Sequence, residues 1–140
     1  MPVIDSNGCA IDAEITGPAD APVLMLSNSL GTTRAMWDPQ MVSFTKKFRV
    51  LRYDRRGHGK SGAPKGPYSM EMLGRDAIAV LDGLGIQKAN WLGLSMGGME
   101  GMWLGANAAD RFDKIILSNC TAHYADRKPW DDRIKLVREK

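Results

Sequence analysis

The chain has 140 residues, 44% of them hydrophobic and 25% charged, which is typical of one soluble globular domain. The formal net charge is +3, from 19 basic and 16 acidic residues. The densest basic run, at 52–60, includes an aspartate and has no basic helix or aromatic-rich strand beside it. We therefore expect no nucleic-acid partner. No apolar run approaches the roughly 18 residues of a membrane span, so we expect no membrane partner either.

Two cysteines, Cys9 and Cys120, lie far apart in segments that we predict to be strands. The N-terminal segment has neither the positive start nor the apolar stretch of a secretory signal. Two thiols without such a signal indicate a reducing compartment, and we expect a cytoplasmic protein.

Strands and helices are predicted to alternate along the chain. Residues 9–16 alternate polar and apolar side chains, as a half-exposed strand does, and 23–26 form a short apolar run typical of a buried strand. Apolar residues at helical spacing predict a helix over 36–48, and 50–53 is the next strand. A second helix is predicted over 70–84, with Gly83 and Gly85 marking its end.

The same alternation continues to the end of the chain. A strand at 89–94 precedes a helix at 96–109, a strand at 114–118 follows, and a polar helix begins at 131. This order predicts an α/β fold with a mostly parallel sheet and flanking helices. Ligands of such sheets bind beyond the carboxyl ends of the strands. Functional residues are therefore expected in 27–34, 54–62, 94–98 and 119–124.

A G-x-S-x-G motif lies at Gly93-Leu94-Ser95-Met96-Gly97, between the predicted strand and helix. In this context the motif is a nucleophile elbow, in which the serine occupies a strained turn above the sheet. Gly93 and Gly97 are expected where neighbouring backbone leaves no room for a side chain. The N–H of Met96 is then one donor of the oxyanion hole, which stabilises the charge that develops during attack. The alternative is a glycine-rich helix start with Ser95 as its N-cap.

Two further loops follow strands on the same edge of the sheet. The turn Ser27–Thr33 is where the second oxyanion donor is expected, with a polar turn that caps the next helix as the alternative. The loop Asp54–Ser61 reads D-R-R-G-H-G-K-S, and its glycines allow tight turns. We interpret it as a structural loop that borders the site, and its His58 as structural.

Together these segments resemble the α/β-hydrolase family in kind and order. Two segments carry a more specific resemblance than the fold family alone. The sequences of Leu26–Thr33 and of Gly93–Gly105 resemble those of the 3-oxoadipate enol-lactonases of the β-ketoadipate pathway. Many relatives have His-Gly where this chain has Asn28-Ser29, and that alignment assigns Leu30 as the second oxyanion donor. The resemblance implies hydrolysis of a small carboxylic ester or of an enol-lactone that carries a carboxylate. It implies no metal and no organic cofactor.

The sequence departs from the family in its triad, which runs Ser, then Asp or Glu, then His. Only His58 and His123 occur here, and neither lies at the family's base position. We interpret His123 as a loop histidine that borders the cap, with a substitute base as the alternative. The resemblance implies a core over 1–128, the start of a cap over 129–140, and a copy truncated before the last strands. Strand 114–118 is then an exposed apolar edge.

Three hypotheses therefore remain open. The first is a serine-dependent enol-lactonase or esterase encoded as a truncated or split copy, for which a complementing C-terminal half or a homo-oligomer is a candidate partner. The second is a non-catalytic relative that binds a small ligand in the same pocket, or half of a two-chain assembly. The third is a general carboxylesterase or a cofactor-free haloperoxidase-like enzyme of the same fold.

Overall fold

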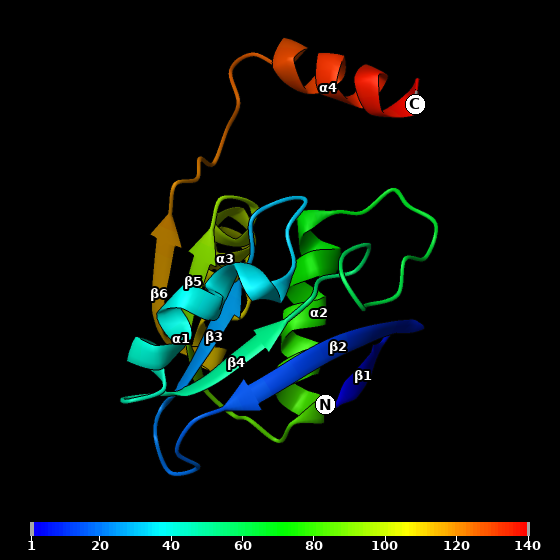
Figure 1. Cartoon of the computed structure of the whole chain (residues 1–140). Helices are drawn as coiled ribbons and strands as arrows, with labels where there is room; N and C mark the ends of the chain where they lie inside the picture. The colour runs from blue at the N-terminus through cyan, green and yellow to red at the C-terminus, as the bar shows by residue number, and fades with distance from the viewer. Residues whose placement is uncertain (1, 140) are drawn as a thin grey trace.

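One six-stranded sheet organises the molecule (Figure 1). The computed structural model describes residues 2–139. The strands are β1 (Val3–Ser6), β2 (Cys9–Thr16), β3 (Val23–Ser27), β4 (Arg49–Tyr53), β5 (Ala89–Leu94) and β6 (Phe112–Ser118). Their order across the sheet is β1-β2-β4-β3-β5-β6. Strands β4, β3, β5 and β6 run parallel, whereas β2 is antiparallel to β1 and β4.

Helices cover both faces of the sheet. The helices of the chain are η1 (Arg34–Trp37), α1 (Asp38–Phe44), α2 (Met70–Gly83), α3 (Met96–Asn107), η2 (Ala109–Arg111) and α4 (Lys128–Arg138). Helices α2 and α3 pack together on one face and α1 lies on the other (Figure 1). Helix α4 lies beyond the carboxyl ends of the strands, at the end of an extended segment that follows β6. The predicted α/β architecture is confirmed.

Two apolar cores hold these layers together, one on each side of the sheet. The larger core joins the sheet to α2 and α3, and Ile11, Leu51, Leu81 and Trp91 are fully buried in it. The smaller core lies under η1 and α1. Strands β3 and β4 are buried on both faces, which explains the continuous apolar run of β3. In β4 the buried positions also include Arg52.

Helix α2 begins and ends where the sequence indicates. The Ser69 hydroxyl accepts a hydrogen bond from the Met72 N–H at 3.1 Å, which satisfies one of the free donors of the first turn. The apolar side chains at helical spacing form the buried face. The helix ends at Gly83, and Gly85 has a positive φ of 67°.

The structure corrects several predicted boundaries. Strand β1 was not predicted, and it forms because a tight turn at Asn7 and Gly8 pairs it with β2. The predicted helix at 36–48 is instead η1 followed by α1, which has a proline in its first turn and ends at Phe44. Helix α3 ends at Asn107 rather than at 109, and α4 begins at Lys128 rather than at 131. Cys120 lies beyond β6 rather than in a strand.

Among the helices that residues 2–139 form, none combines the length and the hydropathy of a membrane span. The same residues contain no cluster of three or more His, Cys, Asp or Glu side chains that could bind a metal ion.

Candidate active site

Ser95 occupies the sharp turn between β5 and α3. Its φ is 57° and its ψ is −114°, a left-handed conformation that a non-glycine residue rarely adopts. Its N–H donates to the Ser118 carbonyl on β6 at 2.9 Å, which anchors the turn to the neighbouring strand. The half-buried Ser95 side chain forms no capping hydrogen bond to α3, so its hydroxyl does not act as an N-cap. This is the backbone that the motif predicts.

Gly93 and Gly97 make this turn possible because backbone from other segments passes close to both. A Cβ on Gly93 would lie 2.0 Å from the Gly97 carbonyl oxygen, and a Cβ on Gly97 would lie 2.3 Å from the Ser27 carbonyl oxygen. Neither distance is compatible with a side chain, so β3, β5 and α3 approach this closely only with glycine at both positions.

Two backbone N–H groups beside Ser95 are available to a ligand. Met96 is the first residue of α3, so its N–H has no acceptor within the helix. Across residues 2–139, the Leu30 N–H makes no hydrogen bond either. Leu30, Ser95 and Met96 line the same cleft. The structure thus brings together the three residues that the sequence predicts for the nucleophile and the oxyanion hole.

The turn that carries Leu30 is fixed by its neighbours on both sides. The Asn28 carbonyl accepts from the Gly97 N–H at 3.1 Å and from Arg55 Nη2 at 2.7 Å. The Ser29 carbonyl accepts from the Thr32 hydroxyl at 2.8 Å. These contacts leave the Leu30 N–H as a free donor inside an otherwise hydrogen-bonded turn.

A buried polar network lies directly below this turn. Glu100 of α3 is fully buried, and its carboxylate accepts from the Tyr53 hydroxyl at 2.5 Å and from the Ser27 hydroxyl at 2.8 Å. Arg55 Nη2 lies 3.3 Å from the same carboxylate. Burial raises the pKa of Glu100 above its ordinary value, and the charge of Arg55 opposes that shift. Burial and the Glu100 charge raise the pKa of Tyr53 well above its ordinary value.

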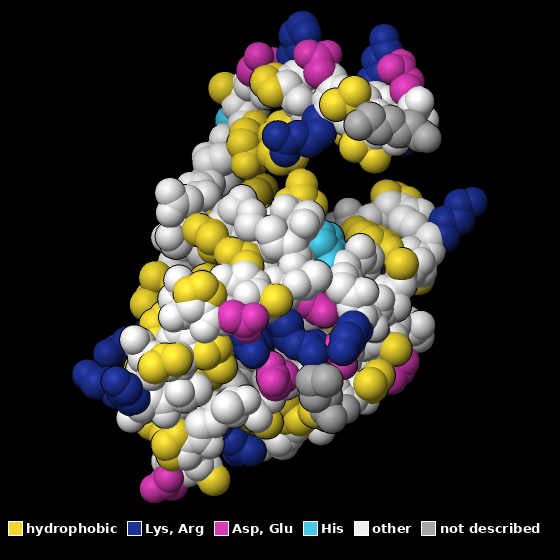
Figure 2. Space-filling view, viewed as in Figure 1, with side chains coloured by type: hydrophobic (Ala, Val, Ile, Leu, Met, Phe, Trp, Pro, Cys, Tyr) yellow, Lys and Arg dark blue, Asp and Glu magenta, His cyan; other side chains and the backbone are white. Residues whose placement is uncertain are grey.

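A cleft of about 460 Å³ opens over Ser95. Its walls are mostly apolar. They come from the core below and, above, from the segment between β6 and α4 and from the first turn of α4. The residues that line it are Leu30, Met70, Ser95, Met96, Met99, His123, Tyr124, Arg127 and Trp130. Figure 2 shows a hollow between α4 and the core, with hydrophobic side chains on both sides of it. Such a cleft suits a small, largely apolar ligand.

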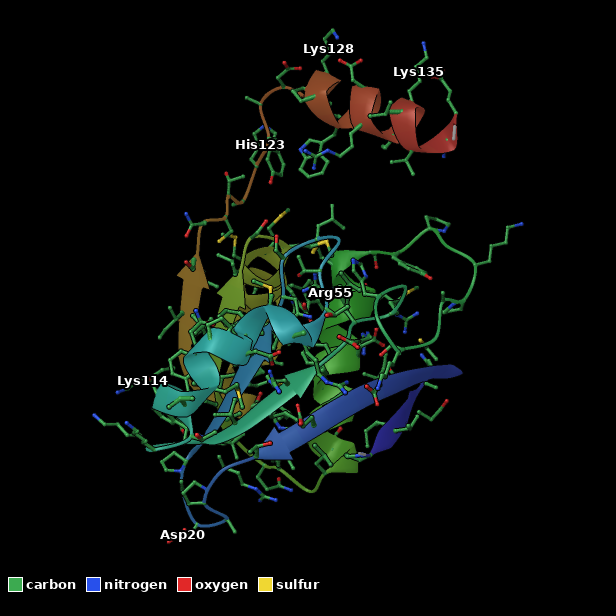
Figure 3. The ribbon with its side chains drawn as sticks, viewed as in Figure 1. Asp20, Arg55, Lys114, His123, Lys128 and Lys135 are labelled. Carbon is green, nitrogen blue, oxygen red and sulfur yellow. The ribbon has the colours of Figure 1, made fainter. Side chains whose placement is uncertain are left out.

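The two histidines occupy different positions. His58, in the loop after β4, is bound through both ring nitrogens, to the Gly31 N–H at 3.0 Å and to the Arg56 carbonyl at 3.1 Å. His123 is exposed on the segment that joins β6 to α4 (Figure 3). It lines the cleft with Ser95. In the part of the chain that the structure describes, its ring forms no hydrogen bond. Ser95 therefore has no hydrogen-bonded base among the described residues.

Sequence reasoning did not identify the polar network or most of the cleft wall. Arg55 and Glu100 lie in segments recognised for other reasons, and a charged residue in a helix usually lies on a solvated face. The available signal was Glu100 itself, an acid within an otherwise apolar and glycine-rich helix. Tyr124 and Trp130 contact each other edge to face at 5.5 Å between ring centroids, but their segment has no periodicity that would reveal this contact.

Comparisons with known proteins agree with this geometry. Residues 22–133 match the model of the alpha/beta hydrolase fold family. The chain is 44% identical to 3-oxoadipate enol-lactonase 2 of Acinetobacter baylyi over 97% of its own length and 51% of the relative's. The solved enol-lactonase of Burkholderia xenovorans LB400 superposes with a TM-score of 0.94 at 45% identity, covering 98% of this chain and 54% of that one.

A third relative is more distant. A thermophilic esterase from Thermogutta terrifontis superposes with a TM-score of 0.84 at 27% identity, covering 98% of this chain and 50% of the esterase. The chain thus spans about half the length of the curated relatives that it matches. The family model covers most of the chain, and the sheet, the elbow and the turn before α1 all have the expected form. The chain belongs to the α/β-hydrolase fold family.

Proposed function

We propose that this chain carries the nucleophile half of a serine-dependent hydrolase that acts on small carboxylic esters or enol-lactones. The observation that supports this most strongly is Ser95, which has a left-handed backbone at the β5–α3 turn and lines a cleft beside two free N–H groups. A strained serine at this point of an α/β sheet has the geometry of a nucleophile elbow, which exposes the hydroxyl for acyl transfer.

In the proposed reaction, the Ser95 hydroxyl attacks the carbonyl carbon of the substrate. The carbonyl oxygen becomes an oxyanion, and the N–H groups of Leu30 and Met96 donate to it. The C–O bond to the leaving oxygen then breaks, this oxygen takes up the proton that the base removed from Ser95, and an acyl group remains on Ser95. A water molecule gives one proton to the base and attacks this acyl group. The acid is released, and the base returns the proton to Ser95. Donors that are already oriented stabilise the oxyanion without reorganising, and removal of one such donor costs about 10²–10³ in rate.

The attack also requires a base, because a serine hydroxyl stays protonated near neutral pH. Both ring nitrogens of His58 are engaged with backbone, which leaves no lone pair for Ser95. We propose that the triad acid and base belong to a segment outside residues 1–140, and that this segment continues the sheet beyond β6. The half-length match to the enol-lactonases supports this assignment. His123 is the alternative base because it lines the same cleft.

For the substrate, we propose 3-oxoadipate enol-lactone, which is hydrolysed to 3-oxoadipate. Apolar and aromatic walls suit the body of such a lactone. Among the residues that line the cleft, Arg127 carries a positive charge, which can attract a free carboxylate. The names of the relatives from Acinetobacter baylyi support the same substrate. A general carboxylesterase is the second candidate, supported by the esterase from Thermogutta terrifontis.

The test combines the chain with the C-terminal half of enol-lactonase 2 of Acinetobacter baylyi and measures hydrolysis of the enol-lactone and of an activated ester. We expect the mixture to hydrolyse the lactone with a higher kcat/KM than the activated ester. The 140-residue chain alone should show little activity on either substrate. Ser95→Ala should abolish the restored activity. Ser43→Ala, at an exposed position of α1, is the matched control and should retain it.

Four results would change the proposal. Restored activity that survives Ser95→Ala would mean that Ser95 is not the nucleophile. Turnover by the chain alone that disappears in His123→Ala would identify His123 as the base. A preference for the simple ester over the lactone would favour the carboxylesterase. Binding of the lactone without any turnover in the mixture would support a non-catalytic relative.

A further inference from the structure

The loop after β4 holds the turn of the oxyanion donor at both of its ends. At one end, Arg55 Nη2 donates to the Asn28 carbonyl at 2.7 Å. At the other end, the Gly31 N–H donates to Nε2 of His58 at 3.0 Å. The free Leu30 N–H lies between these two contacts. Two side chains of one loop, three positions apart, therefore restrain the backbone on either side of the proposed donor.

The two hydrogen bonds of the His58 ring are compatible with only one protonation state. A backbone N–H can only donate, so Nε2 must carry a lone pair to accept from Gly31. The Arg56 carbonyl can only accept, so Nδ1 must carry the proton to make its contact at 3.1 Å. The neutral ring with its proton on Nδ1 satisfies both contacts. The opposite tautomer and the doubly protonated ring each place a hydrogen against the Gly31 N–H.

The backbone of the loop is shaped to present this ring. Gly57 and Gly59 flank His58 and have positive φ values of 74° and 52°. A Cβ at Gly59 would lie 2.1 Å from an oxygen of the Asp54 carboxylate, which itself accepts from the Lys60 N–H at 3.0 Å. The His58 N–H also donates to the Arg55 carbonyl at 3.0 Å. The His58 ring therefore projects from a tight turn whose backbone is fixed by hydrogen bonds.

From this geometry we infer that His58, as the neutral Nδ1–H tautomer, is a positioning residue that fixes the direction of the Leu30 N–H by holding the next amide, Gly31. The inference rests on the proposed function, in which Leu30 supplies an oxyanion donor. It differs from a purely structural role for the loop in one respect. A positioning role requires that the side chain at position 58 accepts a hydrogen bond from the Gly31 N–H. A role in loop stability alone does not require this acceptor.

The first test needs no activity and uses the ¹⁵N-labelled 140-residue chain with the substitution Ile116→Lys, which places a charge on the exposed edge strand β6 and opposes self-association. Ring ¹⁵N shifts report which nitrogen of His58 carries the proton, and a His123→Ala sample assigns the two histidines. We expect a protonated Nδ1 and a bare Nε2. We also compare hydrogen exchange at Gly31 and the N–H order parameter of Leu30 among the wild type, His58→Ala and His58→Gln. The glutamine variant keeps an acceptor near the position of Nε2.

In His58→Ala we expect Gly31 to exchange roughly tenfold faster, because one neutral hydrogen bond is lost, and the Leu30 order parameter to fall. His58→Gln should restore both values, while exchange in the core strands stays the same in all three proteins. A proton on Nε2 would overturn the inference. An unchanged Leu30 order parameter in His58→Ala would also overturn it.

A second arm connects the inference to catalysis, in the mixture with the C-terminal half of the Acinetobacter baylyi enzyme. We expect His58→Ala to lower kcat about tenfold with little change in KM, because a misdirected donor affects the oxyanion and not the bound substrate. His58→Gln should recover most of kcat. A change in KM alone would contradict the inference. If the wild-type mixture shows no hydrolysis that depends on Ser95, the proposed function fails, and the NMR results still decide the role of His58.

Discussion

At the scale of single residues, the strained backbone of Ser95 lowers the stability of the folded chain, and its proposed chemical role accounts for the strain. A non-glycine residue with φ near 57° costs on the order of 1–3 kcal/mol relative to glycine, which adopts this region freely. A serine at this position is thus unfavourable for folding. The proposed nucleophile explains why the sequence has a serine there in place of glycine.

Ser95→Gly should therefore raise the free energy of unfolding by about 1 kcal/mol and abolish the activity of the assembled enzyme. Urea denaturation gives the first quantity and lactone hydrolysis gives the second. Ser43→Gly, within the helix α1, is the matched control. It should lower the free energy of unfolding, because glycine is a poor helix former. A destabilised Ser95→Gly protein would show that the backbone of Ser95 is not strained in solution.

Thr32 is a third residue, besides Arg55 and His58, whose side chain restrains the turn of the proposed oxyanion donor. Its hydroxyl donates to the Ser29 carbonyl at 2.8 Å, and the N–H of the same peptide group belongs to Leu30. The carbonyl and N–H of a trans peptide point in opposite directions, so a fixed carbonyl fixes the N–H. Thr32→Val should lower kcat about tenfold with KM nearly unchanged, and Thr32→Ser should restore kcat. Equal kinetics for the valine and serine variants would argue against this role.

At the scale of elements, the buried pair of Arg55 and Glu100 connects the loop after β4 to α3. Both side chains are buried, and removal of one partner leaves an uncompensated charge. Arg55→Met should therefore lower the free energy of unfolding by about 3–5 kcal/mol near neutral pH. Arg55→Met combined with Glu100→Gln should be less costly than the sum of the two single changes. Denaturant unfolding of all four proteins checks this, and additive effects would show that the pair is not coupled.

The same pair predicts a dependence of stability on pH. Burial raises the pKa of Glu100, while Arg55 lowers it, so Arg55→Met should raise it further. An acid whose pKa is higher in the folded state binds its proton more readily there, so folding gains stability as the pH falls through that raised pKa. The deficit of Arg55→Met should therefore shrink between neutral pH and the ordinary carboxyl pKa of 4.5. A deficit in Tm that stays constant over this range would contradict the shift.

The sequence predicts an element well when the pattern that indicates it lies within a few neighbouring residues. Strands β3 to β6 and α2 follow from apolar patterns within a few residues, and Ser95 follows from a motif whose meaning depends only on a strand before it and a helix after it. Strand β1 was missed because only four residues form it and its pairing with β2 depends on a turn. The networks of Arg55 and His58 depend on contacts between segments that are distant in sequence, and periodicity carries no information about them.

At the scale of the whole molecule, the outer edge of β6 is an exposed apolar edge of the sheet. Within residues 2–139, β6 pairs only with β5, and Ile116 and Leu117 are 55% and 42% exposed. An apolar strand with a free edge is a template for pairing with another chain. On α4, Leu136 and Val137 are also exposed. These surfaces are where we propose that the remainder of the hydrolase packs.

The 140-residue chain alone should therefore self-associate through the edge of β6. Ile116→Lys should reduce this association, because a charge on an edge strand opposes pairing. Val42→Lys is the matched control, since Val42 is also exposed, at 72%, but lies on α1. It should associate as the wild type does. Sedimentation velocity over a range of concentrations measures the difference. A wild-type chain that stays monomeric at all concentrations would contradict the prediction.

The central claim is that Ser95 is the nucleophile, and covalent trapping tests it most directly. The chain is assembled with the C-terminal half of the Acinetobacter baylyi enol-lactonase, treated with a fluorophosphonate, digested and mapped by mass spectrometry. We predict one adduct, on Ser95, that is absent in Ser95→Ala, present in Ser43→Ala and formed in parallel with loss of lactone hydrolysis. An adduct on another residue of the chain, or loss of hydrolysis without modification of Ser95, would contradict the account.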